Sequence, residues 1–253
     1  MHPILFQLGP LTLRSYGLMT AISFALGIIL SVILNRQAGR EDDLILDLST
    51  WVMLGAVVGA RALYVIVEPS EYLAQPWRVI AVWEGGLVFY GGFIGATLTA
   101  YAYLWRQKAP IWSVGDCVAP GLALGHVTGR LGCWFNGCCY GRVDAAHGVV
   151  FPSIGDGLPH LPVMLYEAAF LLVLSAFLVF LWHRRRFDGQ VFWVYVLAYA
   201  SWRFAIEFLR GDDERGTLFS NLLSPSQWIA LVAAAFALVM LARLSKISPP
   251  KAV

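Results

Sequence analysis

Seven long apolar stretches, separated by short polar segments, dominate the hydrophobic pattern of the chain. A helix crosses the hydrocarbon layer of a bilayer with about 20 apolar residues, so each stretch predicts a membrane-spanning helix. Glycines interrupt the third and fourth stretches, and glycines at near-helical spacing permit close helix packing in membranes. The predicted spans are residues 15–35, 46–67, 87–105, 113–135, 162–182, 190–209 and 225–243.

The composition agrees with lipid as the solvent. Apolar residues make up 58% of the 253 residues and charged residues only 13%, about half the charge of an average globular chain. This balance excludes a disordered or nucleic-acid-binding protein and disfavours a single soluble enzyme. We therefore expect an all-α polytopic membrane protein whose residues 1–253 form a single integral membrane domain of about seven transmembrane helices.

The distribution of basic residues predicts the orientation of the spans. Ten Lys and Arg residues follow spans one, three, five and seven, and five lie in the opposite connections at Arg14, Arg78, Arg142, Arg210 and Arg215. Connections rich in Lys and Arg stay in the cytoplasm, so the N-terminus is predicted outside and the C-terminus inside. The longest polar connections, about 137–161 and 210–224, then lie outside and are large enough for a small cap.

The N-terminal segment, residues 1–13, does not have the pattern of a cleaved signal peptide. No Lys or Arg precedes its apolar run, and no small-residue cleavage site follows it. We expect the first helix to be permanent and residues 1–13 to form an amphipathic strip on the outer membrane face.

Three arginines, Arg61, Arg130 and Arg203, fall inside the predicted spans. A charged residue in the bilayer centre costs at least about 2.5–3.5 kcal/mol, so each requires a partner or a ligand. One interpretation is an ion pair with an intramembrane acid, and the acids available are Glu167, Glu207 and Asp116. The other is an anionic ligand, because planar guanidinium groups suit a phosphate well.

Helical spacing brings further polar residues to these arginines. Arg203, Glu207 and Arg210 share one helical face, which predicts a polar cavity opening toward the outer leaflet, where a phosphate-bearing lipid is the obvious anion. His126 precedes Arg130 by four residues. It is either a candidate base or, more commonly for a lone histidine in a span, a hydrogen-bonded packing residue.

The densest motif is the glycine- and cysteine-rich block at residues 129–142, which contains Cys133, Cys138 and Cys139. Its glycines free the backbone from helical geometry, so we expect the block to end the fourth span and line a site. The cysteines allow three interpretations: small buried apolar residues, a disulfide from Cys133 to Cys138 or Cys139, or a metal site. We expect no metal, because adjacent cysteines point apart in a regular backbone and zinc sites favour C-x-x-C pairs.

Six sequence blocks, in order, resemble the bacterial prolipoprotein diacylglyceryl transferases. They are FQLGPLTLRSYGLM (6–19), WEGGLVFYGGFIGA (83–96), GRLGCWFNGCCYGR (129–142), GVVFP (148–152), PVMLYEA (162–168) and RFAIEFLR (203–210). The resemblance implies an enzyme of the bacterial cytoplasmic (inner) membrane, with its active site toward the outer leaflet. It would transfer the diacylglyceryl group of phosphatidylglycerol to the lipobox cysteine of a prolipoprotein, without a metal or cofactor, in the first step of lipoprotein maturation. Its partners would be phosphatidylglycerol, prolipoprotein signal peptides and membrane lipid, with no nucleic acid.

The resemblance also implies a set of site residues. Arg130 and Arg203 would hold the lipid phosphate, and Tyr16 matches another residue of the family's site. Two residues that do not come from the resemblance complete the candidate catalytic set: His126, chosen for its spacing to Arg130, and Tyr90, which stands where the family has a His. The remaining candidate substrate-binding residues are Arg210, Glu207, Asn136, Gly141, Glu167, Tyr166, Gly91 and Gly92.

The sequence departs from the best-known members of this family at several of these blocks. Tyr90 stands in place of a His, Cys133 in place of an Asn, and Cys138 in place of an acidic residue. The His-Pro pair before the LYE segment is replaced by Leu161-Pro162, with His160 one residue early. These departures leave the catalytic base open between His126, Tyr90 and loss of the proton to solvent.

Two rival classes of function fit the same sequence. A membrane acyltransferase would use Cys138 or Cys139 as a covalent nucleophile, and a paralogue that only binds or transports phospholipid would release no glycerol phosphate. A diacylglyceryl mass shift on a lipobox peptide separates both from the transferase.

Overall fold

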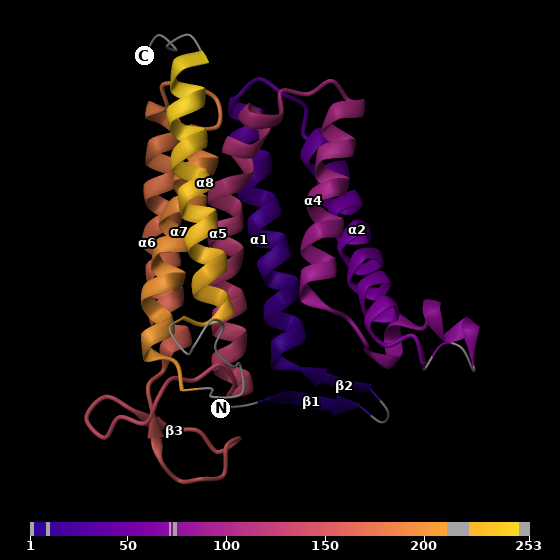
Figure 1. Ribbon diagram of the computed structural model, residues 1–253, viewed down its shortest axis with the longest axis vertical. Helices are drawn as coiled ribbons and strands as arrows, with labels where there is room; N and C mark the ends of the chain where they lie inside the picture. The colour runs from indigo at the N-terminus through magenta and orange to yellow at the C-terminus, as the bar shows by residue number, and fades with distance from the viewer. Residues whose placement is uncertain (1–2, 9–10, 71, 73–74, 212–222, 248–253) are drawn as a thin grey trace. The chain divides into compact units, whose positions relative to one another are not determined.

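Seven α-helices make up most of the part of the chain that the computed structural model describes, residues 3–8, 11–70, 72, 75–211 and 223–247 (Figure 1). Each helix overlaps one predicted span, with ends shifted by at most a few residues. The helical fold class is therefore confirmed. The helices are α1 (Ser15–Gln37), α2 (Asp43–Val67), α4 (Phe89–Arg106), α5 (Ile111–Asn136), α6 (Val163–Arg184), α7 (Gln190–Ile206) and α8 (Pro225–Ile247).

Four of these helices, α1, α2, α6 and α8, are long and apolar enough to cross a membrane. The other three described helices are shorter or more polar. Helix α7 has only 17 residues, α4 has 18 with two adjacent glycines, and α5 carries Asp116, His126 and Arg130 within its 26 residues. The structure thus supports a protein with membrane helices, and the count of seven spans stays a prediction.

Short antiparallel strands and 3-10 turns join the helices. Strands β1 (Ile4–Leu8) and β2 (Leu11–Arg14) form a hairpin, so the N-terminal strip is extended; β3 (Val149–Val150) pairs with β4 (Pro159–His160). The turns are η1 (Pro76–Ile80), η2 (Val82–Glu84) and η3 (Glu207–Leu209). Because η3 begins at Glu207, α7 ends three residues before the end of the predicted span at residue 209. Arg215, Lys251 and most of the 210–224 connection lie outside the described residues.

The chain divides into two compact units, residues 35–114 and the remainder of the chain. In the unit of residues 35–114, glycines hold α2 and α4 together. A Cβ added to Gly95 would lie 2.2 Å from the carbonyl oxygen of Gly55, and one added to Gly91 would lie 2.3 Å from that of Gly59. These distances leave no room for a side chain, so the glycines of the third stretch serve close helix packing.

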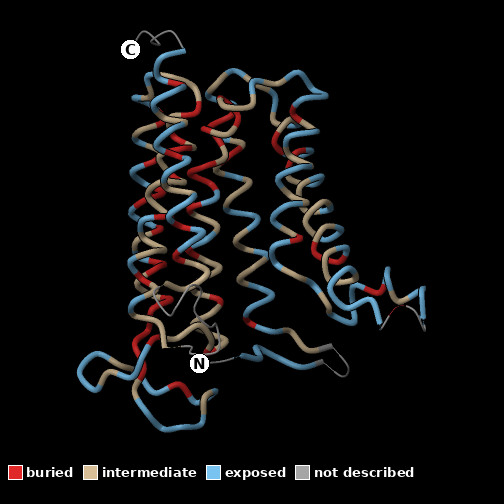
Figure 2. Tube along the Cα trace, in the orientation of Figure 1, coloured by how far each residue is buried: buried red, intermediate tan, exposed pale blue. Residues whose placement is uncertain are grey.

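The other unit contains most of α1 and α5, with α6, α7 and α8. Its buried residues concentrate on α5, α6 and α7 (Figure 2), and α1 approaches α5 closely where a Cβ on Gly27 would lie 3.0 Å from the oxygen of Gly121. Ser23 on α1 also shares a 2.7 Å hydrogen bond with Thr128 on α5. These contacts set α1 beside the helix that carries Arg130.

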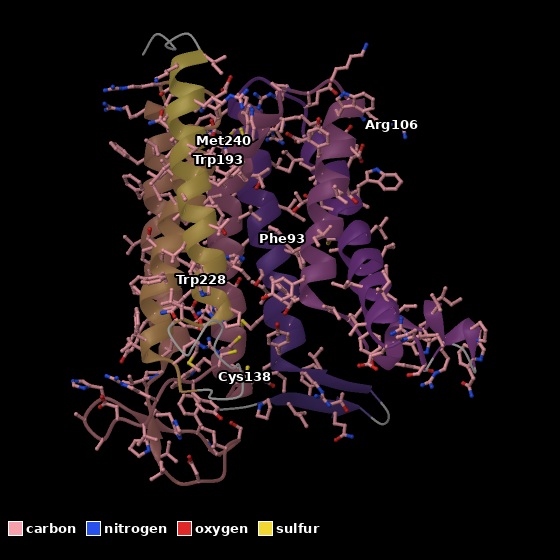
Figure 3. The ribbon with its side chains drawn as sticks, viewed as in Figure 1. Phe93, Arg106, Cys138, Trp193, Trp228 and Met240 are labelled. Atoms are coloured by element: carbon pink, nitrogen blue, oxygen red, sulfur yellow. The ribbon has the colours of Figure 1, made fainter. Side chains whose placement is uncertain are left out.

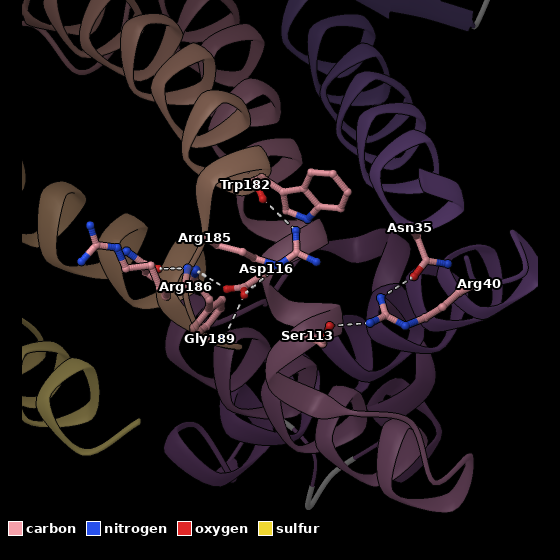
Figure 4. Close-up of polar contacts among 10 residues, drawn as sticks. Asn35, Arg40, Ser113, Asp116, Trp182, Arg185, Arg186 and Gly189 are labelled. Atoms are coloured by element: carbon pink, nitrogen blue, oxygen red, sulfur yellow. Dashed lines mark hydrogen bonds and ion pairs between the residues drawn. The ribbon is translucent and has the colours of Figure 1, made fainter. Parts of the chain in front are cut away.

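Asp116 holds one end of this unit together (Figure 4). Its carboxylate accepts hydrogen bonds from the backbone N–H groups of Gly189, at 2.8 Å, and Phe192, at 3.0 Å, at the start of α7. Arg185 Nε lies 3.9 Å from the same carboxylate. Of the three acids available to the intramembrane arginines, Asp116 therefore serves another contact, because the orphan donors of a helix N-terminus occupy its carboxylate.

Candidate functional site

Arg130 and Glu167 meet across two helices. Arg130 lies near the C-terminal end of α5 and Glu167 near the N-terminal end of α6, and Arg130 Nη2 is 3.0 Å from Glu167 Oε1. The Glu167 side chain is fully buried, whereas that of Arg130 is 21% exposed. The ion-pair interpretation therefore applies to Arg130, whose side chain stays partly accessible.

Arg203 lies in a second polar group at the junction of α7 and α8. Its Nη2 is 2.7 Å from Glu207 Oε2 and donates to the hydroxyl of Ser226 at 3.3 Å. The hydroxyl of Ser224 donates to Glu207 Oε1 at 2.8 Å. The buried Nη1 of Arg203, however, has no hydrogen-bond partner among the described residues. An unsatisfied charged donor is costly, so this nitrogen is suited to an anionic acceptor.

The two polar groups belong to one electrostatic cluster. Glu167 interacts with Arg130, Arg203 and Arg210 together, and Glu207 is ion-paired with Arg203. Three guanidinium groups and two carboxylates leave an excess of one positive charge. A monoanionic phosphodiester would balance that charge, and its oxygens could accept from the forked guanidinium donors.

Arg61, the third arginine within a span, is a structural residue of the unit 35–114. Its Nε donates to the carbonyl of Val79 at 2.9 Å, and its Nη1 donates to those of Gly85, at 2.6 Å, and Gly86, at 3.1 Å. Its Nη2 donates to the carbonyl of Arg78. These contacts tie the segment around η1 and η2 to α2, so Arg61 has partners at every nitrogen and needs no ligand.

His126 has a partner on one ring nitrogen. Its Nδ1 lies 3.3 Å from the hydroxyl of Tyr195 on α7, and its ring centroid is 5.3 Å from that of Tyr199. The residue is nevertheless exposed at the surface of its unit. His126 is therefore positioned by Tyr195 and still has an accessible edge.

Four functional groups follow one another at four-residue spacing: Tyr195, Tyr199 and Arg203 on α7, and Glu207 at the start of η3. Sequence reasoning identified only the last two. Tyr199 also interacts with Arg130, so this series connects His126 to both arginines. The repeated spacing was visible in the sequence and could have found the two tyrosines, whereas Ser224 and Ser226 carried no such signal.

The three cysteines of the 129–142 block converge at the C-terminal end of α5, with Cys133 in its last turn and Cys138 and Cys139 after it. Their Sγ atoms all lie within 4.8 Å of one another, and none of the three forms a disulfide. The expectation that Cys138 and Cys139 point apart is wrong, because the backbone here is not regular: Gly137 has φ 71° and Cys139 has φ 64°. Figure 3 shows Cys138 at the end of the bundle that also carries the loop of β3.

A pocket of about 220 Å³ adjoins the cysteines. It is lined by Gly137, Cys138, Cys139, Tyr140, Ser153 and Ile154. The hydroxyl of Ser153 donates to the carbonyl of Gly137 at 2.6 Å, which ties the 137–161 loop to the left-handed turn after α5. The pocket is therefore bounded by both the cysteine turn and the loop.

Gly141 connects this loop to the end of α7. Its N–H donates to Leu161 at 2.8 Å, and it bridges to Arg210 in the antiparallel sense. A Cβ at this position would lie 2.5 Å from the carbonyl oxygen of Leu209. Only glycine therefore allows the loop to approach the helix end that carries Arg210.

His160 precedes by one residue the position of the family's His-Pro pair, and it supports the 137–161 loop. Its Nδ1 lies 3.0 Å from the carbonyl oxygen of Gly141, and its Nε2 lies 2.8 Å from Asp156 Oδ2. The hydrogen bonds from His160 and from the backbone of Leu158 lower the pKa of Asp156. His160 is buried and acts here as a loop support.

The remaining predicted site residues divide between the two units. At the start of α1, Tyr16 is 48% exposed and borders Gly132 of α5, whose added Cβ would lie 3.4 Å from its ring. Asn136 is the last residue of α5 and interacts with Cys138. Tyr166 packs against the cluster of Leu161, Val163 and Ile206. All of these belong to the unit of the arginine cluster.

Tyr90, Gly91 and Gly92 belong to the unit 35–114, at the start of α4. Tyr90 is 52% exposed and its ring lies edge-on to that of Phe89 at 5.9 Å. Gly91 is buried against α2. Their part in a substrate site stays a prediction.

Comparison with known proteins gives a consistent result over nearly the whole chain. The family model of the prolipoprotein diacylglyceryl transferases matches residues 3–243. A phosphatidylglycerol–prolipoprotein diacylglyceryl transferase from Nostoc sp. is 36% identical, with 95% of this chain and 88% of the relative covered. Proteins of the same name from Geobacter sulfurreducens and Bordetella bronchiseptica are 38% and 36% identical, with 90% of this chain and 89% and 90% of the relatives covered.

Proposed function

We propose, since the chain belongs to the prolipoprotein diacylglyceryl transferase family, that it transfers the diacylglyceryl group of phosphatidylglycerol to the lipobox cysteine of a prolipoprotein. The cysteine sulfur forms a bond to the glycerol carbon next to the phosphate, and the bond from that carbon to the phosphate oxygen breaks. Its electron pair leaves with glycerol phosphate, and the thiol proton is lost. The product is a thioether-linked lipoprotein.

The excess positive charge of the arginine cluster carries this proposal. The side chain of Arg130 is partly accessible, and Arg203 has a buried nitrogen without a hydrogen-bond partner among the described residues. Both would bind the phosphate, with Arg210, Glu207, Glu167, Tyr166, Asn136 and Gly141 around it. Negative charge develops on the leaving oxygen in the transition state, where fixed donors contribute most to the rate.

We place the protein in the bacterial cytoplasmic membrane with seven spans. The positive-inside rule puts the N-terminus and the 137–161 loop outside and the C-terminus in the cytoplasm. Arg130 near the end of α5 and Arg203 near the end of α7 then face the outer leaflet, where an exported prolipoprotein presents its cysteine. Tyr16, Tyr90 and His126 complete the proposed catalytic set, with His126 as acceptor of the thiol proton.

The direct test combines the purified protein in phosphatidylglycerol vesicles with a lipobox peptide. We expect a diacylglyceryl mass increase on the peptide, with release of glycerol phosphate, and no product with the Cys→Ser peptide. Lipid binding without release would instead indicate a binding or transport paralogue. Loss of activity only on joint replacement of Cys138 and Cys139 by alanine, with an acyl group trapped on the protein, would indicate the rival acyltransferase.

The phosphate role is tested by Arg130→Lys and Arg203→Lys. A lysine keeps the charge but not the forked pair of donors, so we expect each variant to lose about 10²–10³ in rate. Arg186→Lys, at an exposed position after α6, is the matched control and should keep its activity. Near-normal labelling by either site variant would contradict the assignment.

A further inference from the structure

The turn after α5 brings thiols together across a helix cap. The N–H of Cys138 donates to the carbonyl of Cys133, and that of Gly137 donates to the carbonyl of Trp134, each at 3.1 Å. With Gly137 at φ 71°, these bonds form a complete Schellman motif, in which the side chains at the positions of Cys133 and Cys138 frequently touch. The Sγ atoms of these two residues and of Cys139 accordingly lie within 4.8 Å of one another.

Backbone geometry limits which of the three thiols can form a disulfide. Consecutive Cα atoms are about 3.8 Å apart, whereas a disulfide usually joins Cα atoms about 4.4–6.8 Å apart. A bridge between the neighbours Cys138 and Cys139 is therefore strained, and the favoured bridge joins Cys133 to one of them. The trio thus offers a thiol that can attack a foreign disulfide and a second thiol that can resolve the product.

Cys139 has the surroundings of an attacking thiol. Hydrogen bonds from the thiols of Cys133 and Cys138 lower the pKa of Cys139, and Arg210 and Arg130 stabilise its thiolate further. The thiolate is the reactive form, and reactive cysteines lie beside cations in partly exposed sites. Cys139 is only partly buried and lines the pocket of about 220 Å³, so a disulfide can approach it from the pocket.

The position of the trio indicates which disulfide it would meet. Thiols outside the cytoplasm are readily converted to disulfides, and a lipobox cysteine held in a disulfide has no thiolate with which to attack the lipid. Arg130, which interacts with Cys139, also belongs to the cluster that would hold the lipid phosphate. A sulfur freed at the trio is therefore released beside its second reactant.

We propose that the cysteine trio reduces disulfides of the lipobox cysteine, a second activity that rests on the proposed transferase function. The Cys139 thiolate attacks the sulfur of the partner thiol, the bond between the two substrate sulfurs breaks, and its electron pair leaves on the lipobox sulfur. Cys133 then attacks the Cys139 sulfur and gives its proton to the departing partner thiol, which leaves a disulfide between Cys133 and Cys139. An external dithiol reduces this bridge and is itself oxidised to a disulfide.

A single-turnover assay without phosphatidylglycerol tests this activity by itself. The full chain, reduced and then freed of reductant in detergent, is mixed at neutral pH with a lipobox peptide whose cysteine carries glutathione in a disulfide. Mass spectrometry should show one freed peptide per protein molecule, released about tenfold faster than by the same concentration of free cysteine, because a larger thiolate fraction speeds the attack. Cys139→Ser should lose this release. Cys117→Ser is the matched control, because Cys117 lies buried on α5 and outside the trio, and it should keep the release.

Cys133→Ser tests the resolving step. Without the resolving thiol, Cys139 should retain the glutathione, so the protein should gain the mass of one glutathione while the peptide is still freed. A digest of the unaltered protein after the reaction should instead contain Cys133 joined to Cys139. Circular dichroism checks that each variant is folded.

The outcomes separate this inference from the proposed function. With phosphatidylglycerol present, Cys139→Ser should modify the reduced peptide at the rate of the unaltered protein but should not modify the glutathione-bound peptide. Equal release of peptide by the unaltered protein and Cys139→Ser, or no glutathione adduct on Cys133→Ser, would overturn the reductase activity and leave the transferase assignment intact. Failure of the unaltered protein to modify the reduced peptide would instead contradict the proposed function.

Discussion

The three arginines within the predicted spans differ in how their nitrogens are satisfied. Arg61 donates to four backbone carbonyls, so its charge serves the fold of its own unit. Arg203 is ion-paired with Glu207 yet has a buried nitrogen without a hydrogen-bond partner among the described residues. Charge inside a span therefore does not identify a ligand-binding residue, whereas an unsatisfied donor beside other cations does.

His126→Gln tests the role of a single side chain in proton transfer. Glutamine can still hydrogen-bond to the hydroxyl of Tyr195, which lies 3.3 Å from His126 Nδ1, but it cannot accept a proton at neutral pH. If His126 is the base, we expect the rate of transfer to fall by about 10² or more while phosphatidylglycerol binding is unchanged.

The control for this prediction is His183→Gln, at the exposed C-terminal end of α6, which should transfer normally. Rates are measured by peptide mass shift and lipid binding by a vesicle pull-down. Unchanged turnover in His126→Gln would remove His126 as the base and assign the proton to interfacial water.

At the scale of helices, glycines determine how closely α2 and α4 pack. Gly95→Ala would place a Cβ 2.2 Å from the backbone oxygen of Gly55, whereas Gly92→Ala would place one 3.3 Å from that of Ala56. The first substitution must push the helix backbones apart and the second needs only a small adjustment. We expect Gly95→Ala to lower the thermal unfolding midpoint in detergent clearly more than Gly92→Ala does, and equal midpoints would contradict this packing.

The 137–161 loop should loosen in acid. Asp156 has a lowered pKa because His160 and the backbone of Leu158 donate to its carboxylate. A group with a lowered folded-state pKa stabilises the fold above its ordinary pKa, and this contribution is lost as the pH falls through the lowered value. We therefore expect residues 153–161 to lose protection against hydrogen exchange, relative to α6, at acidic pH, and already at neutral pH in Asp156→Ala. Amides of α6 serve as the internal reference, and identical exchange in the variant would contradict the role of the pair.

For the molecule as a whole, the length of the apolar stretches predicted the helices, and the cost of buried charge predicted the main cluster. Each of the seven apolar stretches overlaps one described helix. The sequence also predicts Arg130, Arg203, Glu167 and Glu207 as site residues, and the structure joins them in two ion pairs. The sequence could not predict the capping role of Asp116, because that contact joins residues more than 70 positions apart. Nor could it predict the convergence of the cysteines, which depends on the left-handed conformation of Cys139.

The topology of the whole molecule is the remaining prediction. Ten basic residues follow the odd-numbered predicted spans and five lie in the opposite connections, and Lys and Arg near span ends hold a connection in the cytoplasm. Green fluorescent protein fused after Val253 should therefore fluoresce, and alkaline phosphatase fused within the 137–161 loop should be active, since each reporter works on one side of the membrane. Phosphatase activity at the C-terminus would reverse the orientation. Because Arg130 and Arg203 lie near the helix ends that this loop and Arg210 follow, such a result would move the arginine cluster to the cytoplasmic face, out of reach of an exported prolipoprotein.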